Sequence, residues 1–100
     1  MFPSIACDVL VVGGGHAGLM LGAALARAGI EVRLVEPQPL DSIKAARPDG
    51  RSLALLAGSV RIAKEAGVWD FIAADTAAIH QVEVADVQGG GAVRYDSREH

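Results

Sequence analysis

The sequence predicts an α/β fold built around a parallel β-α-β unit. Residues 9–12 form an uninterrupted aliphatic run, and residues 31–36 contain a second one, as strands buried in a parallel sheet do. Between them Ala17, Leu21 and Leu25 recur at near-helical spacing. A strand, a helix and a second strand in this order indicate a right-handed crossover. We expect the first strand to be buried on both faces.

The same segment first has to be distinguished from a membrane span. Residues 9–26 contain no charged side chain, and an uncharged run of this length can cross a bilayer. Five glycines interrupt the run, however, and His16 lies in its middle. Residues 1–8 also lack the positive charge of a secretory signal. We therefore expect neither a transmembrane segment nor a signal peptide.

Gly13, Gly15 and Gly18 spell G-x-G-x-x-G between the first strand and the helix. In this context Gly13 permits the tight turn, Gly15 lets a pyrophosphate approach the backbone, and Gly18 lets the helix pack close to the sheet. The amides of the first helical turn and the helix dipole attract a diphosphate. The motif predicts a Rossmann-like dinucleotide-binding unit. The G-K-[ST] ending of a nucleoside triphosphatase loop is absent.

The expected binding residues extend beyond the three motif glycines. The loop comprises Gly13, Gly14, Gly15, His16, Ala17 and Gly18, with His16 contributing its backbone rather than its imidazole. Glu36 ends the second strand, where a carboxylate accepts hydrogen bonds from both ribose hydroxyls of an adenosine. An acid there repels a 2′-phosphate, so FAD or NAD is expected rather than NADP. The alternative for Glu36 is a solvated charge at a strand end.

The middle of the chain has weaker signals. Residues 37–52 contain three prolines and no sustained periodicity, which indicates a connection that passes over the nucleotide site. Leu53 and Leu55 suggest a short extended segment after it. A helix is expected from about Gly58 and should end near Gly67.

The last third of the chain predicts a further helical turn and a hairpin. The turn is expected over residues 69–74, with Trp69 and Phe71 in the core. Residues 79–96 alternate between apolar and polar side chains around the glycines at 89–91, as an antiparallel hairpin with one solvated face does. We expect this hairpin to begin a second sheet outside the nucleotide unit.

Composition excludes several other classes of function. The 100 residues include 9 Lys and Arg against 12 Asp and Glu, giving a net charge of −3 with no basic cluster. Neither nucleic acid nor an anionic membrane surface is therefore an expected partner. The single cysteine, Cys7, excludes an internal disulfide and fits a reducing compartment. A hydrophobic content of 51% is high for so short a chain, which favours the N-terminal part of a larger protein.

Two stretches together are similar to a known family. DVLVVGGGHAGLMLGAALARAGIEVRLVE at residues 8–36 and DGRSLALLAGSVRIAKEAGVWDFI at residues 49–72 resemble the N-terminal quarter of the flavin-dependent aromatic hydroxylases. The resemblance is to the ubiquinone-biosynthesis branch, related to para-hydroxybenzoate hydroxylase. Many FAD and NAD enzymes share the glycine motif, whereas D-G-R-S-L-A-L and G-V-W-D are more specific to these hydroxylases.

The resemblance implies an FAD-dependent monooxygenase. In that family the glycine loop and the strand-end acid, here Glu36, hold the ADP half of FAD, and the arginine matched by Arg51 lies near the flavin. A guanidinium there can pair with pyrophosphate oxygens, although Arg51 could also be an ordinary surface cation. The expected partners are NAD(P)H, O₂ and an aromatic substrate, a polyprenyl phenol that precedes ubiquinone. The expected location is cytoplasmic, with weak peripheral membrane association.

The resemblance also implies how the chain divides into domains and what this part of the protein can do alone. Residues 1–75 would form the N-terminal part of a three-layer FAD-binding domain, and residues 76–100 would begin the substrate-domain hairpin. The catalytic residues stay unassigned, no metal site is expected, and this part alone should be inactive. Two alternatives stay open: another FAD-dependent oxidoreductase with the same N-terminus, and a non-catalytic dinucleotide-binding module.

Overall fold

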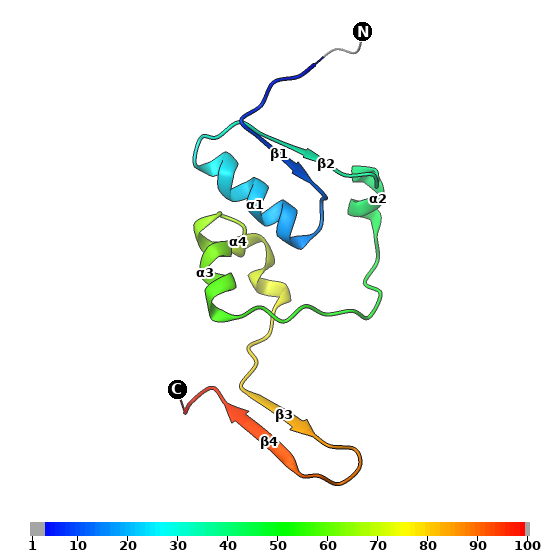
Figure 1. The fold of residues 1–100 in the computed structure, drawn as a ribbon, viewed down its shortest axis with the longest axis vertical. Coiled ribbons are helices and arrows are strands. Elements are labelled where there is room, and N and C mark those ends of the chain that lie inside the picture. Colours follow the sequence, from blue (N-terminus) through cyan, green and yellow to red (C-terminus); the bar gives the residue numbers. More distant parts are fainter. Residues whose placement is uncertain (1–3, 100) are drawn as a thin grey trace.

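The computed structural model describes residues 4–99, which form two separate parts. The elements in chain order are β1 (Val9–Val12), α1 (His16–Arg27), β2 (Val32–Val35), α2 (Leu40–Ala45), α3 (Ala57–Glu65), α4 (Trp69–Ile72), the 3₁₀ helix η1 (Ala73–Asp75), β3 (Gln81–Ala85) and β4 (Ala92–Asp96). The hairpin of β3 and β4 contacts no other helix or strand among the described residues, and it extends away from the α/β part (Figure 1).

The predicted β-α-β crossover is confirmed. β1 and β2 pair in parallel, with Val9 opposite Val32 and Val12 opposite Val35. α1 connects them and packs on one face of this two-stranded sheet, between the sheet and the pair α3 and α4 (Figure 1). None of the helices in residues 4–99 combines the length and the apolar character needed to span a bilayer.

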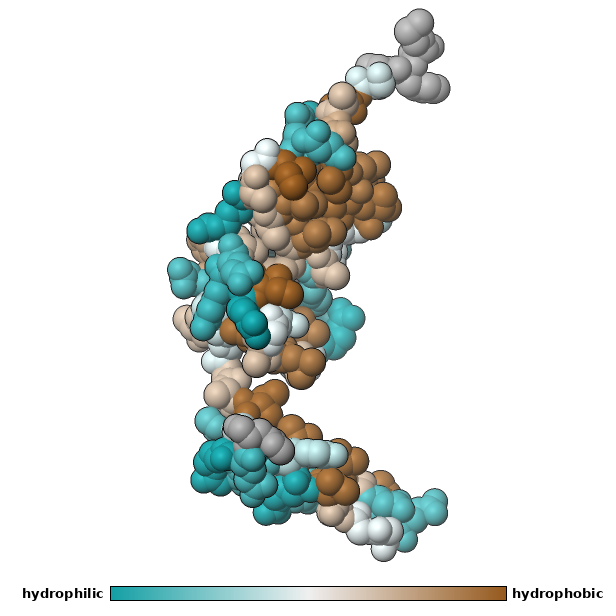
Figure 2. All heavy atoms as spheres, turned by 60° about the vertical axis from the view of Figure 1, so that its left-hand side comes forward, coloured by the Kyte–Doolittle hydropathy of each residue, from teal (hydrophilic) through white to brown (hydrophobic). Residues whose placement is uncertain are grey.

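The expectation that β1 is buried on both faces is wrong for the described structure. Val11, which faces α1, is only 7% exposed, whereas Leu10 is 56% and Val12 80% exposed. The reason is that α1 covers one face of the sheet and no described element covers the other. Figure 2 accordingly shows a broad apolar surface on the α/β part of the molecule.

The connection after β2 is more ordered than its prolines suggest. α2 forms within it, and Pro39 stands at its N-cap position with φ −59°. Six helical residues are too few to produce a recognisable apolar period, which explains why this helix escaped prediction. Leu53 and Leu55, expected in an extended segment, lie in irregular backbone and form no strand.

α3 ends as its sequence predicts. Its last helical residue is followed by Ala66 and then by Gly67, whose φ of +73° is the left-handed conformation that terminates many helices. Ala63 is fully buried and Ala66 is 7% exposed. α3 contacts both α1 and α4.

The two aromatic residues of α4 do not both join the core. Phe71 is 85% exposed, so its predicted core position is wrong in the described structure. Trp69 is half-buried, and the Lys64 ammonium lies 5.8 Å from the centroid of its ring. The physical reason is the shortness of α4, of which only one side packs on α3.

The predicted hairpin is confirmed as an antiparallel sheet with two distinct faces. One face carries Val82 opposite Tyr95, and the other carries Glu83 opposite Arg94, whose side chains form a 2.7 Å ion pair. Among the described residues of the hairpin, only Asp96 is buried. The apolar face, like most of the hairpin, is exposed.

Candidate functional site

The turn between β1 and α1 is shaped by its glycines. The Gly13 amide donates a 2.8 Å hydrogen bond to the Val35 carbonyl, which extends the sheet ladder one residue past β1. Gly13 then takes a φ of +111°, which L side chains rarely adopt. A Cβ on Gly18 would overlap the Gly13 carbonyl oxygen. The helix therefore returns directly over the end of the strand.

The start of α1 offers free donors facing open space. The first intrahelical hydrogen bond runs from the Leu19 amide to the Gly15 carbonyl at 2.9 Å, so the amides of His16, Ala17 and Gly18 precede it. No side chain caps this helix and no acid lies in its first turn. A Cβ on Gly15 would meet nothing within 4 Å. These features fit a diphosphate, which needs donors, positive potential and backbone clearance.

Glu36 is held against this turn by two main-chain donors. Its Oε2 atom accepts a 2.6 Å hydrogen bond from the Gly14 amide, and its Oε1 atom accepts a 3.0 Å hydrogen bond from the Gln38 amide. The Gln38 amide and then the Gly14 amide lower the pKa of Glu36, while partial desolvation opposes them. The carboxylate is therefore ionised at neutral pH and fixed beside the glycine turn.

This arrangement is chemically suited to an unphosphorylated ribose. Each oxygen of a carboxylate can accept more than one hydrogen bond, so both Glu36 oxygens retain capacity for a hydroxyl donor. A phosphate at the same place would meet a fixed negative charge at short range. The described residues thus combine diphosphate donors at α1 with a hydroxyl acceptor at the end of β2.

Arg51 is not brought against the glycine turn. Its Nε donates to Asp49 Oδ2 at 2.7 Å and its amide donates to Asp49 Oδ1 at 3.1 Å. Among the described residues it forms no hydrogen bond with the turn, and its side chain is 89% exposed. The hydrogen bond from the Arg51 side chain is the main cause of the lowered pKa of Asp49.

An apolar groove next to the turn was not anticipated from the sequence. It has a volume of about 630 Å³ and runs along α1, where His16 and Met20 line it. Leu53 and Leu55 form part of its opposite wall. Their alternation, interpreted as an extended segment, is the signal that could have indicated a wall of this kind. His16, the first residue of α1 after the glycine turn, is among the residues that line the groove.

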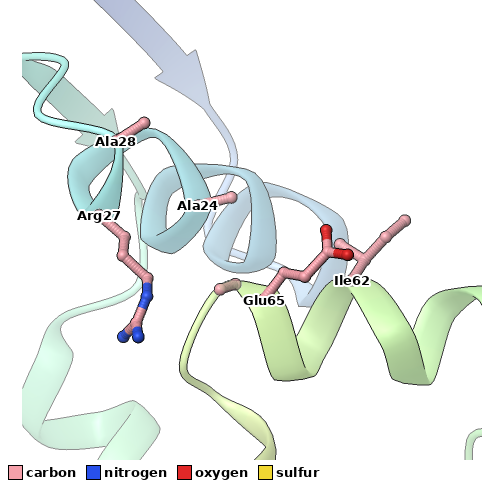
Figure 3. Close-up of a pocket in the computed structure, with 6 residues that line it drawn as sticks. Ala24, Arg27, Ala28, Ile62 and Glu65 are labelled. Atoms are coloured by element: carbon pink, nitrogen blue, oxygen red, sulfur yellow. The ribbon is translucent and has the colours of Figure 1, made fainter.

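A smaller hollow lies toward the other end of α1 and adjoins the groove, with which it shares Ala24 and Ile62. Its volume is about 320 Å³, and its lining comes from α1 and from the last turn of α3 (Figure 3). The residues that line it are Ala24, Arg27, Ala28, Ile62, Glu65 and Ala66. The hollow lies at the opposite end of α1 from the amides of His16, Ala17 and Gly18.

Comparisons with known proteins identify a family and several relatives. A family model described as FAD binding domain matches residues 6–98. The chain is 44% identical over 71 residues to ubiquinone hydroxylase UbiM of Neisseria meningitidis, covering 71% of this chain and 15% of that protein. It is 34% identical over 79 residues to ubiquinone hydroxylase UbiL of Rhodospirillum rubrum, covering 79% of this chain and 18% of that one.

A third relative is named for a different hydroxylation. The chain is 37% identical over 68 residues to 3-demethoxyubiquinol 3-hydroxylase of Escherichia coli, covering 67% of this chain and 17% of the relative. The chain thus spans less than a fifth of the length of these three proteins. No solved structure matches the sequence.

Proposed function

Because the chain belongs to the FAD binding domain family, with FAD as its cofactor, we propose that it builds the ADP-binding half of the site in an aromatic-ring monooxygenase. The observation that carries the proposal is the meeting of the Glu36 carboxylate with the glycine turn, at 2.6 Å from the Gly14 amide. Three relatives named as hydroxylases of ubiquinone or demethoxyubiquinol support a ring substrate of that class.

The proposed roles follow the chemistry of each group. The amides of His16, Ala17 and Gly18 bind the pyrophosphate, since they precede the first hydrogen bond of α1. Glu36 accepts the ribose hydroxyls of the adenosine. Gly13, Gly14 and Gly15 leave room for the nucleotide because they carry no side chain.

Arg51 has a proposed role on the flavin side of the cofactor. Asp49 engages the Nε and one Nη of the guanidinium, which has five N–H donors in all. The remaining donors can pair with a pyrophosphate oxygen without loss of the Asp49 contact. The exposed guanidinium is free to make that contact.

The proposed reaction is ring hydroxylation with NAD(P)H and O₂. FAD held by these residues would supply the redox chemistry, in which NAD(P)H and a proton provide the reducing equivalents, one oxygen atom of O₂ enters the ring as a hydroxyl group and the other leaves as water. The residues described here bind and orient the cofactor and carry no chemical step. A polyprenyl phenol as substrate favours weak attachment of a cytoplasmic protein to a membrane surface.

The proposed division of the chain places residues 1–75 in the cofactor-binding domain and residues 76–100 at the start of a substrate domain. The absence of contacts between β3 or β4 and the described α/β elements supports this boundary. So does the change from a parallel to an antiparallel sheet.

The reaction can be tested with the full-length protein encoded by the gene. We expect incubation with a polyprenyl phenol, NADH or NADPH, and ¹⁸O₂ to give a product that carries one ¹⁸O atom. Oxidation of the nicotinamide without ¹⁸O in the phenol would indicate another FAD-dependent oxidoreductase. A protein that binds nucleotide but oxidises neither NADH nor NADPH would indicate a non-catalytic module.

A further inference from the structure

We propose that the main-chain amide of Gln38 is a positioning group for the ribose, acting through Glu36. The inference rests on the proposed role of Glu36 as the ribose partner. The two oxygens of Glu36 are held from different sides, Oε2 by the turn before α1 and Oε1 by the segment after β2. The segment after β2 therefore belongs to the recognition apparatus, although none of its side chains need touch the cofactor.

The physical basis is preorganisation. A free glutamate side chain rotates about three bonds, and binding a ribose would have to immobilise it. The two amide donors fix the carboxylate beforehand, and each oxygen still accepts a further hydrogen bond. When one donor is removed, the carboxylate can rotate about its remaining hydrogen bond. Recognition of the ribose hydroxyls should therefore weaken, while the amides that bind the pyrophosphate stay unchanged.

Gln38 is well placed for a selective test. It is exposed, it lies outside the glycine turn, and its hydrogen bond to Glu36 uses only its main chain. Gln38→Pro removes the donor within a segment that already carries Pro37 and Pro39. Gln38→Ala removes the side chain and retains the amide, so it is the matched control.

The experiment compares two ligands on the full-length protein after its flavin has been removed. FAD and an FAD analogue without the adenosine 2′-hydroxyl are each titrated, and the flavin fluorescence gives their dissociation constants. For the wild type and Gln38→Ala we expect FAD to bind about tenfold more tightly than the analogue, as a hydrogen bond to a charged group allows. For Gln38→Pro we expect this ratio to fall to about threefold or less.

The possible results distinguish the positioning role of the Gln38 amide from its premise, the ribose contact of Glu36. A ratio in Gln38→Pro equal to that of the wild type, even with both ligands bound more weakly, would overturn the positioning role. A wild type that does not distinguish the two ligands would instead remove Glu36 from the ribose site, and with it the premise.

A second variant keeps the test decisive should Gln38→Pro not fold. Gly14 has no left-handed φ, but a Cβ there would lie 3.0 Å from Glu36 Oε2 and would push the carboxylate aside. Gly14→Ala should therefore lower the ratio, whereas Gly15→Ala, whose Cβ meets nothing within 4 Å, should weaken both ligands equally. An unchanged ratio in Gly14→Ala would refute a fixed carboxylate.

Discussion

The Oε2 atom of Glu36 accepts a 2.6 Å hydrogen bond from the amide of Gly14, so the end of β2 is tied to the turn that begins α1. The bond joins two groups 22 residues apart in the sequence. It brings the acid that we assign to the ribose next to the amides that we assign to the pyrophosphate.

Gly18→Ala should destabilise the protein and release FAD. Its Cβ would overlap the Gly13 carbonyl oxygen, a backbone atom that can move only if α1 shifts away from β1. We expect a loss of about 1–3 kcal/mol in the free energy of unfolding, as for other overpacked positions. Urea denaturation and the flavin content after gel filtration measure the two effects.

Gly22→Ala is the matched control for this change. It also lies within α1, but its Cβ would stand 3.9 Å from the Leu34 side chain, an ordinary contact. Replacing a helical glycine by alanine should raise stability by up to about 1 kcal/mol. Equal losses in the two variants would show that close approach at Gly18 is not what matters.

The end of α3 provides a second test of backbone conformation. Gly67 has a φ of +73°, and a Cβ there would also overlap the Arg27 guanidinium. Gly67→Ala should cost about 1–2 kcal/mol because an L side chain is strained in this conformation. Gly58→Ala, in open space within α3, should instead be neutral or stabilising. Thermal unfolding of both variants measures this contrast. A loss of stability in Gly58→Ala as large as that in Gly67→Ala would contradict it.

How far the sequence predicts this molecule depends on how local each signal is. The glycine turn and the hairpin could be predicted because short motifs and alternation encode them. The exposure of Leu10 and Phe71 could not, since burial depends on what covers a side chain in three dimensions. α2 was not predicted because its six residues show no clear helical periodicity of apolar side chains.

Some features of the candidate site could likewise be predicted from local sequence, and others could not. Glu36 could be selected from its position after the second apolar run, because the acidic residue that binds the ribose in such folds stands at a strand end. Its two amide partners could not be inferred, since they depend on the path of the chain after β2. The pairing of Arg51 with Asp49 likewise follows from side-chain geometry in the turn around Gly50.

Acidification should destabilise the protein partly through Glu36. Its pKa is lowered from 4.5 in the folded chain by the Gln38 and Gly14 amides. A carboxyl group of this kind stabilises the fold above the pKa of the unfolded chain, and the contribution is lost as the pH falls through the folded pKa. We expect unfolding free energies measured from pH 7 down to below 4.5 to decline less steeply in Glu36→Gln than in the wild type. Parallel curves would exclude a stabilising role for the ionised group.

Arg51→Ala should weaken FAD binding without a comparable effect on stability. The side chain is 89% exposed and bonded to its neighbour Asp49, so its removal disturbs no core contact. Loss of a charged donor to a pyrophosphate oxygen should raise the dissociation constant about tenfold or more. Arg47→Ala, a charge removed four positions earlier in the same exposed segment, controls for net charge. An equal effect in the two variants would make Arg51 an ordinary surface cation.

The nucleotide that copurifies with the full-length protein shows whether Glu36 and the glycine turn bind the ADP half of FAD. Denaturation of the pure protein, followed by chromatography of the released compound, identifies and quantifies it. We expect FAD at about one molecule per chain in the wild type and little or none in Glu36→Arg, whose guanidinium cannot accept a ribose hydrogen bond. FAD retained in full by Glu36→Arg, or NADP released from the wild type, would overturn the proposed cofactor site.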